Sequence, residues 1–589
     1  MRPRLRSVGL VLGIFVLAAS PFRVPAGIPT ASAQALPRVS FVASPGASIL
    51  VHGEYPRADS PCVSPVQPRL HARYEGTIEV GKASDGRLFV IGVLPFEEYL
   101  KGIAEVPRTW PMAALKAQVV AARSYALAHI DNPDPTGRAL GYQLCATTAC
   151  QVYRGLGISA GPYGDRWERA VESTAGEVLL YRGRPADTLY SSTSPGYTIG
   201  NDQVFGTDPL PYLRPVEEND DGASPVSRWR VRLPFADIRR FLRAAGHWGS
   251  EPVTAVRLRG SNVVVRGGGA SETLDVGHFR SHMNFWAHCL DPAGYPSIDT
   301  DGTRLPQTVP SIWFGPSTEG SAAVLEGRGW GHGVGMVQWG AYGKAQRGLP
   351  YREILASYYG GLRPQTYPMP QVIRVGIAVG LRSVRISGNG RVRVEGRNPG
   401  PGPWLVTGGE RLRVRRAGPP PTFIAAGEVS DAPRRARVGR TITTTIAVPQ
   451  LSVVNLVLRA PGPDIEVSGR TTYPPGVHEI RWAVPDLPSG SYRLQAVVTD
   501  GVDIVRTPAR DVRVTGGTAS PTPTPSPSPS ATPREPTALP TTARPPAAAP
   551  AGGSSSVPVL PLALAALVSV AAALVLLVRW SRRSGPRVG

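Results

Sequence analysis

The residues that could do chemistry in this sequence gather around Glu105, which lies in the stretch 94–129. The pattern of this stretch predicts two helices joined by a short corner. Pro107 ends the first helix, since the residue before a proline avoids the α region, and Pro111 suits the start of the second. Glu105 is therefore expected in the last turn of the first helix, facing the second. A partly buried carboxyl group in such a place can stay protonated near neutral pH and act as a general acid.

The same stretch also allows a plainer reading. Glu97 and Glu98 fall in the first turn of the first helix, where the helix dipole favours negative charge. Glu105 itself can be a solvated glutamate at a helix end, without a chemical role. The second helix is rich in alanine, so a neighbouring element can approach it closely. Three of its polar side chains are candidates for the same site: Lys116, Gln118 and Arg123.

The glycine-rich stretch 327–361 is the second candidate region. The spacing of its glycines and lysine does not fit a phosphate-binding loop. The glycines instead allow the backbone to pass close to another group, and His332 lies between two of them with no neighbouring side chain to shield it. His332 can equally be a hydrogen-bonded structural histidine, so both readings stay open.

These stretches carry a resemblance to a known family. Residues 94–107 (LPFEEYLKGIAEVP) and 114–126 (ALKAQVVAARSYA) resemble one signature of the SpoIID/LytB family, named after stage II sporulation protein D and an amidase enhancer. Residues 327–361 resemble the other signature. Two further blocks, CQVYRG at 150–155 and YSSTSPGYTIGNDQVFG at 190–206, fall between them in family order.

The resemblance implies a reaction. Relatives of the sporulation branch are lytic transglycosylases, which cut peptidoglycan between N-acetylmuramic acid and N-acetylglucosamine and prefer strands already stripped of peptide. Their product carries a 1,6-anhydro ring, because the sugar's own hydroxyl attacks in place of water. One carboxyl can serve first as acid and then as base, so the usual pair of carboxyl groups is unnecessary. Glu105 aligns with the family's catalytic glutamate.

The resemblance also implies alternatives without catalysis. The amidase enhancers of the family bind and stimulate an amidase, so this chain can be an enzyme or a non-catalytic activator of an N-acetylmuramoyl-L-alanine amidase. A glycan-binding wall anchor is a third hypothesis. Relatives usually show a second glycine where Pro195 stands, so the backbone of that block can differ here. The residues expected to bind peptidoglycan glycan strands are Lys116, Gln118, Arg123, Ser192, Thr193, His332, Gly335 and Gln338.

Cys145 and Cys150 are close in sequence and could form a disulfide or half of a zinc site. Some relatives hold a zinc ion near this position through a histidine and two cysteines. Here Ala149 stands where the histidine often precedes the second cysteine, so we expect a disulfide and no metal or other cofactor, with zinc as the alternative. Cys62 and Cys289 would be left to pair, although four cysteines allow three connectivities.

Two other motifs lack the flanking residues that their functions require. Ser159 lies in a match to the G-x-S-x-G elbow of hydrolases, but Pro162 follows soon after where a helix is required, so we expect a loop. His278 and His282 have a metal-like spacing. The zinc-protease motif needs a glutamate directly after the first histidine, however, and Phe279 stands there.

The expected fold class is α+β: a SpoIID-type mixed domain with helices around β-sheets, followed by a β-sandwich that resembles Ig-like modules. A Pro-rich, disordered stalk and a transmembrane helix complete the chain. The expected bounds are 1–33 for a signal peptide, 38–370 for the SpoIID/LytB-like domain with a variable middle at 228–300, 371–436 for a β-rich segment, 437–515 for the β-sandwich, 516–556 for the stalk, 558–578 for the transmembrane helix and 579–589 for a cytoplasmic tail.

The charge of the chain bears on its location and partners. Four arginines lie in the leader and four beyond the apolar run, with no acid in either, so +13 of the formal +21 belongs to the part between. That surplus suits a polyanionic setting such as a cell wall. We find no nucleic-acid recognition motif, and we interpret the basic residues as dispersed along the sequence, so nucleic acid is not an expected partner. The protein is expected outside the cell, anchored in the membrane by the C-terminal helix, with a wall amidase as a candidate partner.

Overall fold

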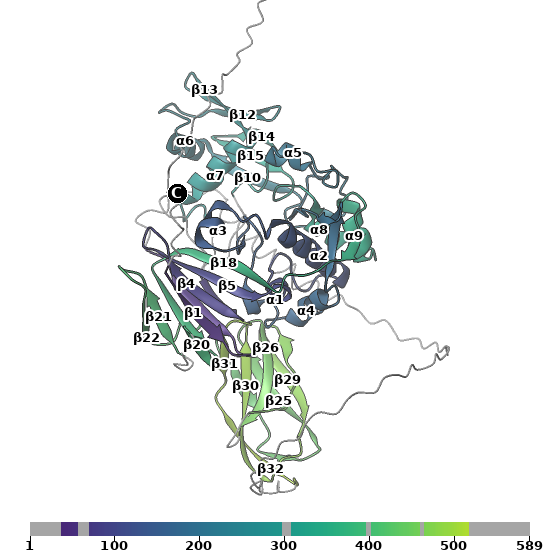
Figure 1. Cartoon of the computed structure of the whole chain (residues 1–589). Helices are drawn as coiled ribbons and strands as arrows, with labels where there is room; N and C mark the ends of the chain where they lie inside the picture. Colours follow the sequence, from purple (N-terminus) through teal and green to yellow (C-terminus); the bar gives the residue numbers. More distant parts are fainter. Residues whose placement is uncertain (1–36, 57–69, 297–307, 396–401, 460–463, 518–589) are drawn as a thin grey trace, which may run out of the picture.

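The computed structural model describes residues 37–56, 70–296, 308–395, 402–459 and 464–517, and this part combines helices and sheets in an α+β structure (Figure 1). The expected signal peptide, the apolar C-terminal run, the tail and all of the expected stalk except Gly516 and Gly517 lie outside the described residues, and so does Cys62. Within the described residues, no helix is both long enough and apolar enough to cross a membrane.

The first core lies between two sheets. The six-stranded sheet has the order β20 (Val392–Val394), β1 (Arg38–Ala43), β4 (Thr77–Lys82), β5 (Leu88–Pro95), β18 (Val372–Leu381) and β6 (Leu144–Cys145). The five-stranded sheet has the order β22 (Arg413–Arg416), β21 (Trp404–Thr407), β19 (Ser383–Gly388), β2 (Ile49–Glu54) and β3 (Leu70–Tyr74). Along β1, Val39 and Phe41 are buried and Ser40 between them is partly exposed, the alternation of a half-buried strand. The β-rich segment 371–436 thus supplies strands to both sheets of the first domain.

Strand β5 delivers the chain to the corner that holds Glu105. Helix α1 (Phe96–Lys101) follows it and is shorter than expected, because Gly102 ends the helix and Ile103 turns into a β-bridge with Tyr153. Glu105 therefore lies in the loop after α1 and not in its last turn, which corrects the expectation from sequence. Helix α2 (Met112–His129) starts directly after Pro111 as expected.

Helix α2 is surrounded by other elements. Alanines on several sides of it are buried, including Ala114, Ala117, Ala121 and Ala126, so neighbouring elements cover most of the helix. It packs against α4 (Gly164–Glu172), α8 (Gln338–Gln346), α9 (Tyr351–Tyr358) and β7 (Glu177–Tyr181). Short elements complete this layer: α3 (Pro135–Leu140), β8 (Arg184–Pro185), β9 (Tyr190–Ser191), α5 (Asn201–Phe205), β16 (Met336–Val337) and β17 (Pro364–Thr366).

The middle of the chain has a hydrophobic core of its own. One sheet has the order β10 (Trp229–Pro234), β15 (Ala322–Gly327) and β14 (Phe314–Glu319), and a second has β11 (Ala255–Arg259), β12 (Asn262–Gly267) and β13 (Ala270–Asp275). Helices α6 (Phe235–Ala244) and α7 (Val276–Leu290) pack with them at the upper end of the molecule in Figure 1. Since β10 pairs with β15, this unit extends past residue 300 to the start of the glycine-rich stretch.

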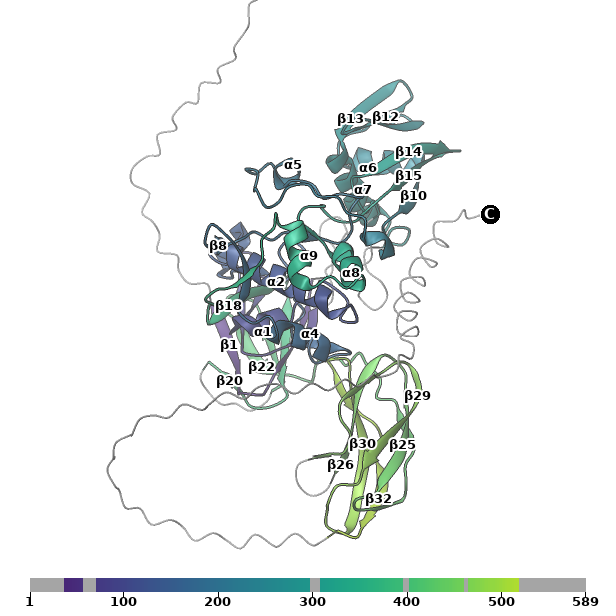
Figure 2. The same cartoon turned by 90° about the vertical axis from the view of Figure 1, so that its right-hand side faces the viewer.

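The C-terminal part of the described chain consists of two sheets around a third core. The smaller sheet has the order β23 (Glu428–Asp431), β25 (Thr441–Val448) and β29 (Gly476–Ala483). The larger contains β24 (Arg435–Arg437), β32 (Arg510–Thr515), β30 (Gly490–Thr499), β26 (Ser452–Arg459) and β27 (Ile465–Glu466), with β28 (Thr471–Tyr473) and β31 (Ile504–Arg506) beside it. This C-terminal part as a whole lies below the first domain (Figure 2). One contact between the two is that of His71 Nε2 with Asp503 Oδ1, at 3.0 Å. A relation to Ig-like modules stays a prediction.

Candidate active site

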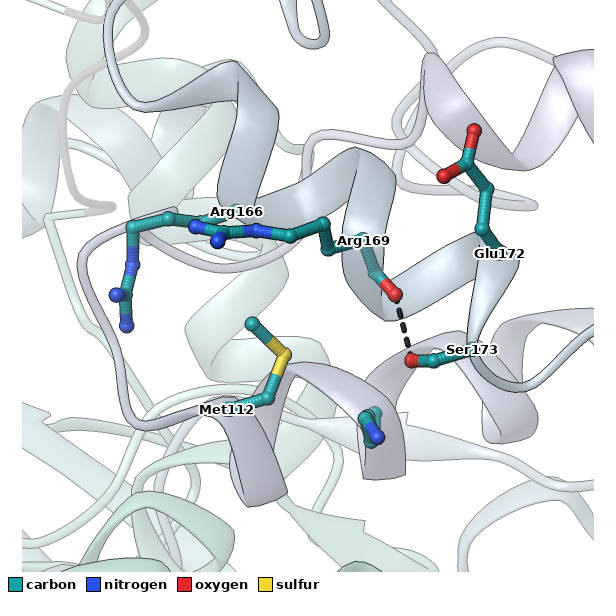
Figure 3. A pocket seen from close by; sticks show the side chains of 6 residues that line it. Met112, Arg166, Arg169, Glu172 and Ser173 are labelled. Carbon is teal, nitrogen blue, oxygen red and sulfur yellow. Dashed lines mark hydrogen bonds between the residues drawn. The ribbon is translucent and has the colours of Figure 1, made fainter.

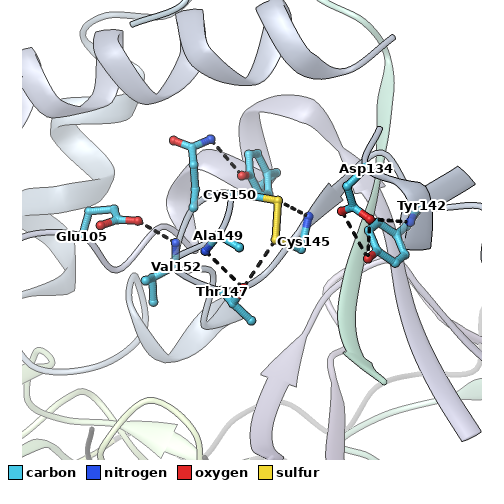
Figure 4. The surroundings of a disulfide bond; sticks show 11 residues. Glu105, Asp134, Tyr142, Cys145, Thr147, Ala149, Cys150 and Val152 are labelled. Atoms are coloured by element: carbon cyan, nitrogen blue, oxygen red, sulfur yellow. Dashed lines mark hydrogen bonds between the residues drawn. A yellow bond between two sulfur atoms is a disulfide. The ribbon is translucent and has the colours of Figure 1, made fainter. Parts of the chain in front are cut away.

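Glu105 is fixed in its corner by the strand-like stretch that follows Cys150. The Ala104 amide donates to the Val152 carbonyl oxygen at 2.8 Å, and the Val152 amide donates to Glu105 Oε1 at 2.6 Å (Figure 4). On the other side, Gln338 Nε2 donates to the Glu105 carbonyl oxygen at 3.4 Å. The backbone and the carboxyl group of Glu105 are therefore both held in place by residues distant in sequence.

Burial dominates the electrostatics of Glu105. Removal from water raises the pKa of its carboxyl above the ordinary value, and hydrogen bonds from Val152, Gln338 and Tyr190 oppose the shift without cancelling it. None of the groups that shift the pKa of Glu105 is another carboxylate. A raised pKa keeps a larger share of the carboxyl protonated near neutral pH, as a general acid requires. Glu105 thus differs from a fully solvated glutamate at a helix end, although the residue as a whole stays partly exposed.

Three further residues that we did not predict from the sequence form a hydrogen-bonded wall beside Glu105: Tyr190, Gln151 and Tyr99. Tyr190 donates from its hydroxyl to Gln151 Oε1 at 2.7 Å, and Gln151 Nε2 donates to the Tyr99 hydroxyl at 3.0 Å. Burial, with the nearby Glu105 as a second cause, holds the pKa of Tyr190 well above its usual range, so its phenol stays a hydrogen-bond donor. All three residues lie inside the quoted signature blocks, which was the signal that could have found them.

Gln118 and Gln338 contact each other next to Glu105, and their binding of glycan stays a prediction. Gln338 Nε2 donates to Gln118 Oε1 at 3.3 Å and so connects α2 to α8 next to Glu105. Gln118 Nε2 is buried and has no hydrogen-bond partner among the described residues. Both glutamines therefore belong to the surroundings of Glu105.

Arg123 has a different role from the one expected. Its side chain is fully buried and donates in a fork to Glu97, from Nε to Oε1 at 2.9 Å and from Nη2 to Oε2 at 2.8 Å. Its remaining donors reach the backbone oxygens of Val171 and Glu177. The guanidinium is thus consumed in joining α1, α2 and α4, and it is not available to a glycan strand.

Lys116 also lies away from Glu105. It is two residues before Gln118 and so projects from about the opposite side of α2. Its Nζ lies 5.6 Å from the centre of the Tyr351 ring. There it lines an open depression of about 620 Å³ between α2 and α4 (Figure 3). The depression is lined by Met112, Lys116, Arg166, Arg169, Glu172 and Ser173.

The expected contacts of Ser192 and Thr193 turn out to be partly internal. Thr193 is buried, and its Oγ1 lies 2.7 Å from Ser224 Oγ and 3.1 Å from Ser192 Oγ. Thr193 also forms a β-bridge with Trp330, so the block 190–206 is paired to the glycine-rich stretch. Ser192 is partly exposed, and of the two it is the one that a ligand can reach.

Gly335 is needed for packing. Its φ is +71°, in the left-handed region, and an added Cβ would overlap the Leu189 carbonyl oxygen. Met336 and Val337, directly after it, pair in parallel with Tyr190 and Ser191. Gly335 therefore allows the backbone of the glycine-rich stretch to lie close against the backbone of β9, the strand that carries Tyr190.

His332 fits the structural alternative. Its Nδ1 accepts from the Val334 amide at 3.1 Å, and its ring lies 5.4 Å from that of Phe205. Burial lowers the pKa of His332 to about 4, against an opposing hydrogen bond with the Tyr190 backbone. The imidazole is therefore neutral at physiological pH and connects the glycine-rich stretch to Tyr190.

Cys145 and Cys150 are joined by a disulfide, with their Cα atoms 5.5 Å apart (Figure 4). Their sulfur atoms and an Asp134 carboxylate oxygen lie within 4.8 Å of one another, a grouping that could suggest a metal. A cysteine binds zinc as a thiolate, and sulfurs bonded to each other do not provide thiolates, so one carboxylate would remain as a ligand. Asp134 also accepts from the Gly137 amide at 2.8 Å as the cap of α3. The residues as bonded do not fit a zinc ion; the disulfide instead fixes the turn that leads to Val152.

This chain is similar to proteins of one family. The sequence model described as SpoIID, stage II sporulation protein, matches residues 84–181, which include Glu105 and the disulfide. An uncharacterized protein from Brachyspira hyodysenteriae is 32% identical over 279 residues, covering 47% of this chain and 68% of that protein. Stage II sporulation protein D from Bacillus subtilis is 27% identical over 279 residues, with 46% and 74% covered. The amidase enhancer from the same organism is 28% identical over 304 residues, with 46% and 40% covered.

Proposed function

We propose that this chain, which belongs to the SpoIID/LytB family, remodels the cell wall by cutting peptidoglycan glycan strands as a lytic transglycosylase. The observation that carries the proposal is the environment of Glu105: a single carboxyl group, desolvated and fixed by the Val152 amide, with a raised pKa. An acid of this kind suits a reaction that needs one carboxyl group for two proton transfers.

The reaction follows from that single group. Protonated Glu105 gives its proton to the glycosidic oxygen as the bond from this oxygen to C1 of N-acetylmuramic acid breaks. The resulting carboxylate then takes the proton of the C6 hydroxyl of the same sugar, whose oxygen bonds to C1 and closes the 1,6-anhydro ring. Glu105 ends the cycle protonated, and no water is consumed. The Val152 amide, which donates to Glu105 Oε1 at 2.6 Å, stabilises the transient carboxylate.

Peptide-stripped glycan is the expected substrate, and its digestion tests the proposal. The purified chain should release products with terminal 1,6-anhydro sugars, read by mass spectrometry. Glu105→Gln should abolish them, because an amide cannot deliver the proton, and loss of a general acid costs about 10² to 10⁴ in rate. The amide oxygen can still accept from Val152, so the circular dichroism spectrum and glycan binding should persist.

The matched control is Glu98→Gln. Glu98 lies in the same stretch but pairs with Lys101 at 3.2 Å on the surface, so the variant should keep its activity. Ordinary hydrolysis products without an anhydro ring, or equal activity of wild type and Glu105→Gln, would contradict the proposed reaction.

A regulatory function is the second candidate, favoured by the similarity to the amidase enhancer. In that case wild type and Glu105→Gln would both be inert on stripped glycan, and both would stimulate a cell-wall amidase to the same extent. Mixing each variant with an amidase and intact peptidoglycan, and measuring the released peptide, separates the two functions.

The location of the chain is part of the proposal. The charged and apolar leader and the apolar run at 558–578 support export and retention by a C-terminal helix, with the bulk of the protein facing the wall. Protease added to intact cells without their wall should then release a large soluble fragment. Protection of nearly all of the chain would refute this topology.

A further inference from the structure

The arginines of this chain are concentrated in one segment. Residues 371–427 contain ten arginines, no lysine and only two acidic residues, so these 57 residues carry a formal charge of +8. The whole chain between the leader and the C-terminal tail carries +13. More than half of that surplus therefore belongs to a tenth of the sequence, and the expectation of dispersed basic residues does not hold here.

The fold brings these arginines to two neighbouring sheet edges. Strand β22 is one edge of the five-stranded sheet, and β20 is one edge of the six-stranded sheet. Both strands lie in the same part of the first domain (Figures 1 and 2), and their neighbours contact each other, since the rings of Phe41 on β1 and Trp404 on β21 have centroids 5.7 Å apart. The exposed arginines on or directly before these strands are Arg391, Arg393, Arg411, Arg413 and Arg415. Alternate residues of a strand are about 7 Å apart on one side, so each edge presents a row of guanidinium groups.

These five arginines differ from their neighbours in lacking acidic partners. Within the part of the chain that the structure describes, none of them has a carboxylate at ion-pair distance, whereas Arg374 is paired with Glu79 at 2.7 Å and Arg382 with Glu54 at 2.9 Å. Charged residues on an edge strand can serve only to prevent pairing with another strand. Five exposed guanidinium groups on two sheet edges, without ion-pair partners among the described residues, exceed that need and leave their charge available to a ligand.

We propose that β20 and β22 form a docking surface for a linear polyanion linked by phosphodiesters, of the kind that a cell wall can contain. Guanidinium groups match phosphate oxygens in a two-pronged geometry, and rows of them suit a chain of repeated charges. A membrane surface is a poorer fit, because such surfaces add apolar side chains that insert, and Val414 is the one large apolar residue exposed on these two strands. Stripped glycan offers only one carboxylate per disaccharide, a lower charge density.

The binding of long-chain inorganic polyphosphate to the purified full-length chain tests the proposal. Fluorescence anisotropy should show binding at physiological ionic strength that weakens steeply as salt is added. A variant without four of these arginines should bind at least about tenfold more weakly, because the local positive potential falls. The substitutions are Arg391→Gln, Arg393→Gln, Arg413→Gln and Arg415→Gln.

Two controls make the test specific. Arg257→Gln with Arg259→Gln removes two exposed arginines with the same spacing from β11 and should leave binding unchanged. Glu105→Gln should also bind as wild type does, so failure of this proposal and failure of the proposed reaction are separable. If the fourfold variant aggregates, the pairs Arg391→Gln/Arg393→Gln and Arg413→Gln/Arg415→Gln replace it, and each should weaken binding.

Several results would overturn the proposal. Wild type that does not bind polyphosphate at physiological ionic strength would do so, and so would arginine variants that bind as well as wild type. Tighter binding of wild type to stripped glycan or to phosphatidylglycerol vesicles than to polyphosphate would show that the surface serves the substrate or a membrane instead.

Discussion

The pair of Glu97 and buried Arg123 gives the sharpest test of how the structure is held together around Glu105. From sequence, Glu97 is explained by the helix dipole, and its loss should matter little. In the structure its carboxylate is the counter-ion of a guanidinium that is fully buried. Glu97→Gln would leave that cation without its charge partner, and breaking a buried pair commonly costs about 3 to 5 kcal/mol.

The magnitude must be reduced for exposure. The Glu97 side chain is 31% exposed, so solvent screens part of the interaction, and the neutral amide can still accept one hydrogen bond. We therefore expect Glu97→Gln to lower the free energy of unfolding by about 2 kcal/mol, or the midpoint of thermal unfolding by about 4 °C. Differential scanning calorimetry on the full-length chain measures this directly.

Glu98→Gln is the matched control because it differs in its partner and in little else. The Glu98 side chain is 32% exposed and pairs with Lys101, whose side chain is 16% exposed, in the same short helix. It should lose only about 0.5 kcal/mol. Glu97→Gln combined with Arg123→Gln should recover part of the loss, since the uncompensated charge is gone. Equal shifts for Glu97→Gln and Glu98→Gln would refute the role of the buried guanidinium.

The remaining predictions concern the other parts of the site. Gly335→Ala should destabilise the chain by more than about 2 kcal/mol in thermal unfolding, whereas Gly348→Ala, with φ at +88° and open space around it, should cost about 1 kcal/mol. Cys145→Ser with Cys150→Ser should cost about 2 kcal/mol and slow glycan cleavage; a variant as stable and active as wild type would contradict this. The pKa of Glu105 is raised in the folded state, so its contribution to stability is present below its ordinary pKa and is lost as pH rises through the folded-state pKa. Glu105→Gln should therefore have a higher thermal stability than wild type at pH 7 but not at pH 4.

Much of the local structure was predictable because it depends on neighbours in sequence. Pro111 starts α2, and the acidic first turn of α1 follows Pro95, as proline geometry and the helix dipole require. The signature blocks identified Glu105, Gln118 and Gln338 as members of one site. The sequence also favoured the disulfide, because Cys145 and Cys150 are close enough to pair by a local turn.

The assignments that failed depend on contacts distant in sequence. Arg123 and Lys116 lie on the same helix as Gln118, and only the packing of α1, α4 and α9 around α2 decides which side chain meets Glu105. The same holds for the end of α1, where a bridge from Ile103 to Tyr153 replaces the expected last turn.

The sequence by itself determined which residues can do chemistry and which helices carry them, because residue type, proline positions and helical period act over a few residues. Tertiary structure alone decided that Glu105 is desolvated, that Tyr190 and Gln151 form its wall, and that Arg123 is consumed by Glu97. Desolvation and ion pairing depend on which surfaces meet, and those surfaces come from segments distant in sequence. Glu105 and Gln338, for example, are 233 residues apart. A pattern read along one chain segment contains no information about such a distance.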